Sequence, residues 1–235
     1  NMVKYWKGSK MKVKELKEEE RPREKAIQYG VNALSNRELI ALLLRSGTQS
    51  LSALELADKV LALKATLGEL GNASIQELMC IKGIKKAKAI ELNAAFELCR
   101  RIAFDKVMHK EQIEEPQDIL EWLNQEIGYA KQEHFLVLFL DQRNHVLCYR
   151  TMFMGTLTSA SVHPREIFKE AMQQGCAKII CVHNHPSGDA TPSDADITLT
   201  KAIQEAGKMV AIPLIDHIIV ARNTYISFRQ KRLMD

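Results

Sequence analysis

The sequence predicts an α/β (α+β) fold, with a mixed-sheet domain flanked by helices and a small all-helical domain before it. Residues 22–104 contain a series of helix signals, whereas helix and strand patterns alternate after Pro116. The chain has 235 residues, of which 46% are hydrophobic, and this is enough to form two cores. We therefore expect a helical domain over residues 1–104 and a mixed-sheet domain over residues 115–235.

The helical half follows a charge-rich opening, residues 7–25, which has little to bury and should be mobile. Ser-x-x-Glu capping boxes predict helix starts at Ser35 and Ser74. Apolar residues recur at helical intervals over residues 50–63, and a long helix is predicted over residues 85–103. The polar stretch 105–116 is predicted to be the linker between the two domains.

The second half alternates between helical and extended patterns. In chain order, the pattern predicts a helix, two strands, a helix, a strand, a helix and two short strands over residues 116–128, 134–141, 145–155, 164–174, 178–182, 193–207 and 215–228. Short turns join some strands directly and helices join others, so the sheet should be mixed.

Charge and cysteine usage narrow the class of protein. Residues 1–104 carry 19 basic and 12 acidic side chains, whereas residues 105–235 carry 14 and 17. Nucleic acid is the natural partner for such a basic half, but on charge alone a solubilising surface is the preferred explanation. The five cysteines are scattered without a CxxC pair, which fits a reducing cytoplasm. With no apolar run of transmembrane length and no signal peptide, we expect a cytoplasmic protein that binds no membrane.

One helical hairpin, residues 78–101, resembles a helix-hairpin-helix element, which binds nucleic-acid phosphates through the start of its second helix. A lysine cluster surrounds its turn at Lys82, Lys85, Lys86 and Lys88. The chain departs from the Gly-x-Gly pattern, because Lys85 replaces the second glycine after Gly83. The resemblance implies non-specific DNA binding, and the alternative is a hairpin that only packs against its neighbours.

The densest chemistry lies in "CVHNHPSGDATPSDAD", residues 181–196. His183 and His185 end a predicted strand and, at a spacing of two, should point to the same side. Asp196 follows in the first turn of the next predicted helix, with Ser193 as its N-cap. Two imidazoles and a carboxylate would leave the fourth position of a tetrahedral zinc ion open for water.

Spacing leaves other interpretations open. Ser193-x-x-Asp196 is close to a capping box, in which Asp196 would serve only the helix start, and Asp189 and Asp194 are also near. His217, on a later strand, is predicted to be a core histidine, with contact to the metal site as the alternative. From spacing alone, this stretch is either a metal site or a polar turn.

The stretch "HNHPSGDATPSDAD" matches the JAMM motif, in which His-x-His is followed by ten residues and Asp, with Ser three residues before the Asp. Together with "GTLTSASVHPREIFKEAMQQGCAKIICV", it resembles the RadC family over essentially the whole chain, with an MPN domain from about residue 115. The resemblance implies a zinc-dependent hydrolase of peptide or isopeptide bonds. The metal ligands would be His183, His185 and Asp196.

The same resemblance implies two catalytic residues. Ser193 would help to hold the oxyanion of a tetrahedral intermediate, and a glutamate at the head of an earlier strand would act as the general base. Glu133 is the best match for this base, and Glu166, in a predicted first helical turn, is the rival.

Rival functions remain at this point. The family name carries a DNA-repair attribution, so the alternative is a DNA-associated protein whose MPN domain is a scaffold. Two zinc-enzyme classes are excluded, because the chain lacks the P-C-x-x-C that nucleobase deaminases need beside their H-x-E and lacks the H-E-x-x-H of common metalloproteases. The sequence identifies neither the peptide or protein substrate nor the oligomeric state.

Overall fold

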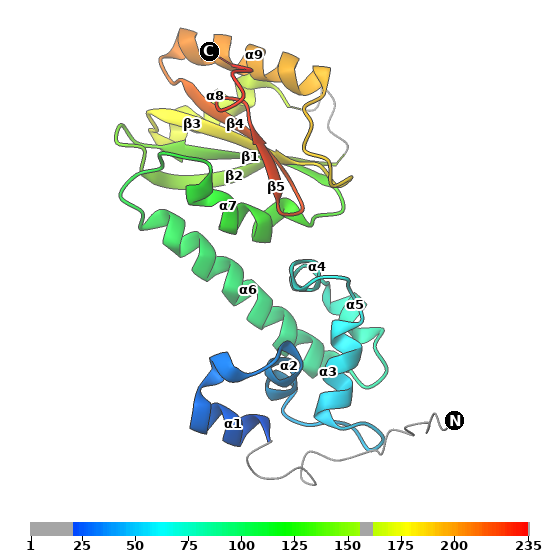
Figure 1. Cartoon of the computed structure of the whole chain (residues 1–235). Coiled ribbons are helices and arrows are strands. Elements are labelled where there is room, and N and C mark those ends of the chain that lie inside the picture. The colour runs from blue at the N-terminus through cyan, green and yellow to red at the C-terminus, as the bar shows by residue number, and fades with distance from the viewer. Residues whose placement is uncertain (1–20, 156–161, 235) are drawn as a thin grey trace, which may run out of the picture. The chain divides into compact units, whose positions relative to one another are not determined.

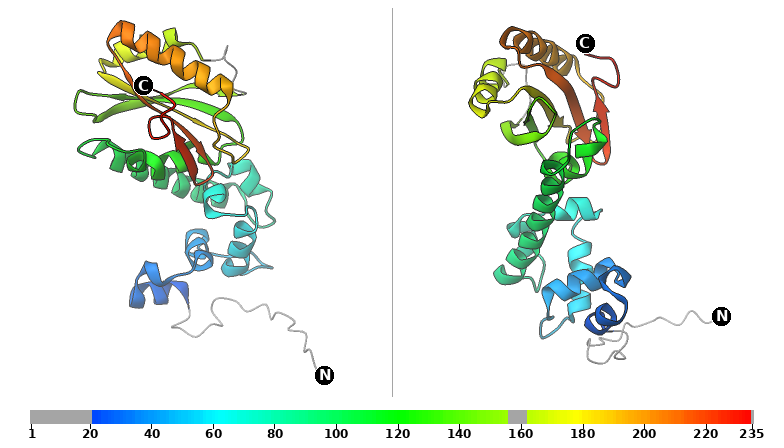
Figure 2. Two further views of the ribbon diagram at one scale, coloured as in Figure 1. Left: turned by 45° about the horizontal axis from the view of Figure 1, so that its top comes forward. Right: turned by 90° about the vertical axis from the view of Figure 1, so that its left-hand side faces the viewer.

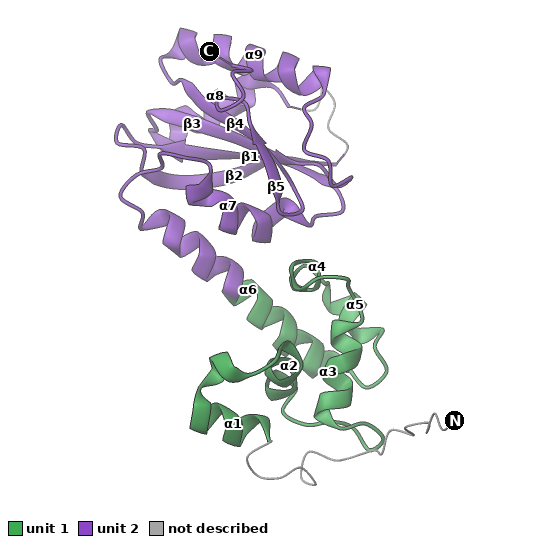
Figure 3. Cartoon of the chain, in the orientation of Figure 1, with its two compact units in different colours: residues 1–98 green, residues 99–235 purple. Residues whose placement is uncertain are grey.

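The structure, a computed structural model, describes residues 21–155 and 162–234 (Figure 1). The chain divides into two compact units, residues 1–98 and 99–235 (Figure 3). The division falls inside one long helix, α6 (Lys86–Met108). Most of the opening that is predicted to be mobile, residues 7–25, lies outside the described residues. The predicted domain bounds, 1–104 and 115–235, remain a prediction, because this division does not test them.

The first unit is built from helices, as predicted. Its described elements before α6 are α1 (Pro22–Tyr29), the 3-10 turn η3 (Val31–Ala33), α2 (Asn36–Leu44), α3 (Ala53–Leu61), α4 (Leu67–Gly71) and α5 (Ile75–Met79). Both predicted capping boxes are present, at Ser35 and Ser74, and a third starts α3 at Ser52. In each box the serine hydroxyl and a glutamate carboxylate accept hydrogen bonds from backbone N–H groups that the helix start leaves unpaired.

Lys88 has a structural task in the first unit. Its ammonium group donates to the backbone carbonyl of Leu44 at 2.6 Å and also to that of Ser46. These carbonyls lie at the end of α2, where the helix leaves acceptors unpaired. Lys88 therefore caps α2, and the DNA-binding role of the lysine cluster stays a prediction.

The helix α6 extends farther than predicted. It continues to Met108, so the predicted linker, residues 105–116, is wrong for its first four residues. The cause is burial, because Ala103 and Val107 lie one turn apart and both belong to the core of the second unit. Neither this helix nor any other in the described ranges has both the length and the apolar character needed to cross a membrane.

The second unit contains a mixed five-stranded sheet in the order β2-β1-β3-β4-β5. Its strands are β1 (Glu133–Leu140), β2 (Val146–Gly155), β3 (Lys178–Asn184), β4 (Leu214–Ala221) and β5 (Thr224–Ser227). The β3 and β4 strands pair in parallel and every other pair is antiparallel, which confirms the predicted mixed sheet. The parallel pair requires a crossover, and α9 (Asp194–Val210) supplies it.

Helices cover both faces of this sheet. On one face lies α7 (Gln117–Leu123), which continues as a π-helical turn over Asn124–Gly128, and on the other lie α8 (Pro164–Gln174) and α9 (Figures 1 and 2). The interior strand β1 is buried on both sides, which explains its nearly continuous apolar sequence, HFLVLFL.

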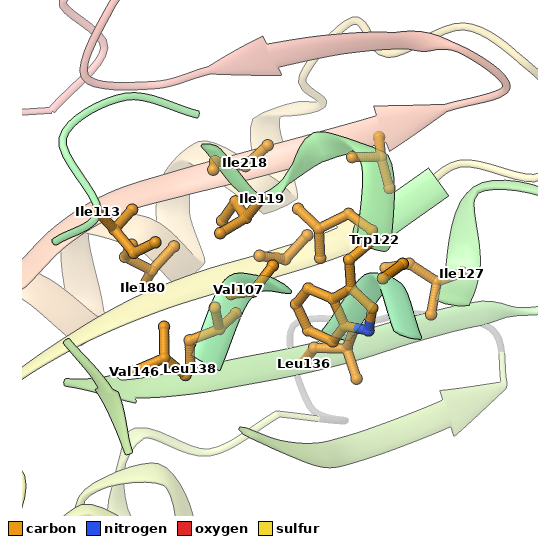
Figure 4. Packing of buried hydrophobic residues seen from close by; sticks show 14 of the residues in the cluster. Val107, Ile113, Ile119, Trp122, Ile127, Leu136, Leu138, Val146, Ile180 and Ile218 are labelled. Atoms are coloured by element: carbon orange, nitrogen blue, oxygen red, sulfur yellow. The ribbon is translucent and has the colours of Figure 1, made fainter. Parts of the chain in front are cut away.

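The two faces have separate hydrophobic cores. Leu136 and Leu138 of β1 join Trp122 in the core on the α7 side (Figure 4). Phe135 and Val137, which alternate with them along the strand, join the core beneath α8 and α9. The metal-site candidates lie at the end of the sheet on this second side, where β3 leads into the loop before α9.

Gly207 lies inside α9, at a point where neighbouring atoms approach the helix closely, and does not mark the end of the helix. The predicted helix stops there, yet α9 continues to Val210 and ends at Ala211, whose φ of 57° is left-handed. A Cβ on Gly207 would lie 2.6 Å from the Ile212 carbonyl oxygen and 3.2 Å from the Phe168 ring. The missing side chain therefore lets α9 lie against α8 and the following loop, a tertiary reason that sequence pattern does not reveal.

We expect Gly207→Ala to destabilise the second unit by about 1–3 kcal/mol, because overpacking costs more than the alanine gains in helix propensity. The control is Met209→Ala, since Met209 is 87% exposed on the same helix and its truncation should change the free energy of unfolding by about 0.5 kcal/mol or less. Denaturant unfolding measures both values. An alanine at 207 that stabilises the protein would contradict the close approach.

Candidate metal centre

Three predicted ligands converge where β3 ends and α9 begins. The candidate ligand atoms of His183, His185 and Asp196 all lie within 4.8 Å of one another. Nε2 of His183 is 3.0 Å from Nε2 of His185 and 3.1 Å from Oδ1 of Asp196. Nε2 of His185 is 3.6 Å from Oδ2 of the same carboxylate. The structure thus brings these residues together, and their role as ligands stays a prediction.

Asp196 serves the helix start and the cluster at once. Its Oδ2 accepts hydrogen bonds from the Ser193 backbone N–H at 2.8 Å and from the Ser193 hydroxyl at 2.6 Å. The Asp196 N–H in turn donates to the Ser193 hydroxyl at 3.2 Å, which completes a capping box. Oδ1 is the oxygen that faces His183. The two interpretations that spacing left open are therefore compatible.

The chemistry of the cluster fits a divalent metal. Nδ1 of His185 lies 2.8 Å from the Asp189 carbonyl oxygen, which can only accept, so this nitrogen carries the proton. In the neutral form of His185, Nε2 then carries a lone pair that faces Asp196. Lone pairs and a carboxylate at these distances repel one another unless a cation or a proton lies between them. Two imidazoles and a carboxylate are a usual ligand set for zinc and related ions.

Burial and mutual contact control the charges of the three groups. Burial alone would raise the pKa of Asp196, but its close contacts with the His183 and His185 rings and the hydrogen bond from Ser193 hold that pKa well below its usual range. Burial lowers the pKa of His183, whereas the hydrogen bond with Asp196 raises the pKa of His185. Asp196 therefore remains ionised at neutral pH and offers a cation a nearly buried negative charge.

The antiparallel register places Glu133 at this cluster. Phe135 pairs with His183 at the end of the β1–β3 ladder, and Glu133 lies two residues earlier on β1, so it is on the same face as Phe135 at this end of the sheet. Its negative charge makes a small contribution that favours the protonated form of both histidines, although burial still lowers the pKa of His183. Glu166 lies in the first turn of α8, where its carboxylate pairs with Arg165 at 3.0 Å and its side chain is 46% exposed.

Asn184, between the two histidines, is a residue that the sequence interpretation missed. Its fully buried side chain accepts a hydrogen bond from the His134 N–H at 2.7 Å and donates to the Gln132 carbonyl at 3.1 Å. One amide thus fastens the backbone on both sides of Glu133 to the strand that carries the histidines. Strand alternation predicts that Asn184 points away from them, but its partners lie some fifty residues earlier and have no local signal.

His217 is both a buried histidine, as predicted, and a direct partner of the cluster. Its Nε2 lies 2.9 Å from Nδ1 of His183, and its Nδ1 lies 2.6 Å from the Thr200 hydroxyl. Burial lowers its pKa well below the usual value, so the ring is neutral. Thr200 was also missed, although it lies one helical turn after Asp196 and therefore on the same face of α9.

Comparisons with known proteins agree with this architecture. A family described as the RadC-like JAB domain matches residues 113–233, which include the whole cluster. The chain belongs to the RadC family. The UPF0758 N-terminal family matches residues 13–90 of this RadC chain.

Relatives of this RadC chain resemble it from end to end. A UPF0758 protein of Shouchella clausii is 44% identical over 93% of the chain and 95% of its own length. A UPF0758 protein of Halalkalibacterium halodurans is 43% identical, over 94% of the chain and 95% of its own length. One from Bacillus cereus is 42% identical, over 93% and 97%. The likeness therefore extends across both units, while these names state no activity.

We expect the full chain to bind one equivalent of zinc and the His183→Ala variant to bind none, because three protein ligands are needed for a stable site. The control is His145→Ala, which removes a histidine that pairs with Asp141 in the β1–β2 turn. Metal analysis after removal of loosely bound ions measures the stoichiometry. Retention of one tightly bound equivalent by His183→Ala would rule out this ligand set.

Proposed function

We propose that this RadC-family protein is a zinc-dependent hydrolase that cleaves a peptide or isopeptide bond. The observation that carries the proposal is the convergence of His183, His185 and Asp196. Glu133 lies at the end of β1 beside the strand that carries His183. A metal-assisted hydrolase needs a set of metal ligands and, near them, one further carboxylate that acts as the general base. The resemblance to the JAMM motif supports the same reaction class.

When bound by the three ligands, zinc would supply a Lewis acid and lower the pKa of a water molecule. Residues of the chain itself would then carry out the proton transfers. Glu133 is half-buried at the head of β1, so its carboxylate can accept a proton from water and pass it to the nitrogen of the leaving amine. The Asn184 amide, which fastens the flanking backbone, keeps this carboxylate beside the histidines.

Ser193 is suited to stabilise negative charge on the substrate. Its hydroxyl lies at the edge of the cluster and donates to Asp196. Rotation of the side chain would direct this hydroxyl toward a substrate oxygen, while the Ser193 backbone N–H still holds the Asp196 carboxylate. We propose that Ser193 acts as an oxyanion donor by this rotation.

We also propose a cytoplasmic location and a peptide or protein substrate. All five cysteines are free, and burial raises the pKa of the Cys181 thiol, so it remains protonated in the core. An intracellular reducing environment is consistent with unpaired cysteines.

We expect Glu133→Gln to bind zinc normally and to reduce turnover by at least about 100-fold, because the amide cannot accept the proton. Glu166→Gln is the control and should leave both properties unchanged. The zinc-loaded proteins are compared on fluorogenic peptides and isopeptide-linked conjugates. If Glu166→Gln loses turnover and Glu133→Gln does not, the assignment of the base is wrong.

As a second function, we propose that the first unit binds DNA non-specifically. The specific observation is the turn between α5 and α6, where Gly83 has a φ of 107°. Lys82, Lys85 and Lys86 are exposed around this turn at the start of α6. Three exposed cations at a helix start form a surface that attracts phosphates.

We expect the triple variant Lys82→Glu, Lys85→Glu, Lys86→Glu to weaken DNA binding and to reduce the slope of log K against log salt by up to about 3. The matched control changes three exposed lysines of the second unit, Lys169, Lys201 and Lys208, to glutamate. Fluorescence anisotropy with duplex DNA at several salt concentrations measures both effects. Equal losses in the two variants would show that only net charge matters.

A further inference from the structure

A buried series of hydrogen bonds connects α9 to His183, one of the three candidate metal ligands. The Thr200 hydroxyl lies 2.6 Å from the Asp196 carbonyl oxygen and 2.6 Å from Nδ1 of His217. Nε2 of His217 lies 2.9 Å from Nδ1 of His183. Thr200, His217 and His183 have no exposed surface, so solvent does not compete for these contacts.

The backbone carbonyl of Asp196 sets the direction of every proton in this series of hydrogen bonds. Because a carbonyl oxygen only accepts, the Thr200 hydroxyl hydrogen points to Asp196. The Thr200 oxygen then accepts from the Nδ1–H of His217, and Nε2 of this neutral ring is left as an acceptor. His183 donates its Nδ1–H to that acceptor. The lone pair on Nε2 of His183 is therefore left facing Asp196 and His185.

Aromatic rings hold His217 in the orientation that this chain requires. Phe228 stacks on the imidazole with ring centroids 4.8 Å apart and an interplanar angle of 24°. Phe135 packs against it at 5.6 Å and 60°. These contacts fix the plane of the ring, with one nitrogen directed to Thr200 and the other to His183.

We propose that Thr200 and His217 are positioning residues that set the tautomer of His183 and thereby raise the affinity of the cluster for a divalent metal. The inference rests on the proposed metal site. A neutral imidazole can carry its proton on either nitrogen, and a proton on Nε2 of His183 would occupy the position of the ion. One helix, α9, then supplies a ligand through Asp196 and orients another through Thr200.

Two threonines of α9 provide a matched pair for the test. Both donate to the carbonyl four residues earlier, Thr200 to Asp196 and Thr198 to Asp194 at 2.8 Å. Thr198 is exposed, and Thr200 is buried against His217. Thr200→Val removes the hydroxyl and lets the His217–His183 pair reverse its protons. Thr200→Ser keeps the hydroxyl, and Thr198→Val is the control.

We expect Thr200→Val to bind zinc about 10–100-fold more weakly than the unaltered chain, which is the usual effect of losing a hydrogen-bond partner behind a metal-bound histidine. Thr200→Ser should restore the affinity, and Thr198→Val should leave it unchanged. Chelator competition measures the dissociation constants, and thermal unfolding confirms that each variant is folded. Wild-type affinity in Thr200→Val, or an equal loss in Thr198→Val, would overturn the proposal.

The tautomer itself can be measured without metal. Long-range ¹H–¹⁵N NMR correlations of the metal-free full chain should show His183 protonated at Nδ1, and Thr200→Val should shift proton density to Nε2 while Thr198→Val does not. A His183 proton on Nε2 in the unaltered chain would overturn the relay. This readout separates the two proposals, because a chain that binds no zinc yet shows the Nδ1–H tautomer would refute the metal site and leave the relay standing.

Discussion

The Asp196 carboxylate lies where the first turn of α9 meets the end of β3, and its two oxygens are used differently. Oδ2 closes the capping box with Ser193, which fixes where the helix begins. Oδ1 is left to face His183. Because the cap holds the carboxylate in place, the helix start and the ligand cluster cannot move independently. The proposed catalytic geometry depends on this shared carboxylate.

The surroundings of Asp196 extend the same constraint. Glu133 lies at the end of the β1–β3 ladder, and the Asn184 side chain fastens that part of β1 to β3. On the other side, the Asp196 backbone carbonyl directs the Thr200 hydroxyl and, through His217, the proton of His183. Few of these groups meet water, so each hydrogen bond is stronger and each unpaired group more costly than at the surface. Stability and proposed function use the same contacts.

The parts that the sequence predicted correctly are local. His183 lies on β3 and His185 directly follows its last residue, so their spacing of two predicts the same side, and Ser193 begins a helix because a carboxylate follows three residues later. The alternation of helices and strands after Pro116 predicted the mixed sheet in the same way.

The parts that the sequence did not reveal depend on distant contacts. Helix α6 continues into the predicted linker because Val107 is buried in the core of the second unit, and Gly207 lies inside a helix because a loop carbonyl approaches it. Thr200 and Asn184 look like ordinary polar residues until their partners are brought beside them. Glu133 was suggested by family resemblance, because local sequence does not show that its end of β1 lies beside the end of β3.

X-ray absorption spectroscopy at the zinc edge of the zinc-loaded full chain tests the central claim most directly. We predict two imidazole nitrogens at about 2.0–2.1 Å together with oxygen ligands at about 2.0–2.2 Å. Sulfur scattering at about 2.3 Å, or a signal without two imidazoles, would contradict a centre built from His183, His185 and Asp196.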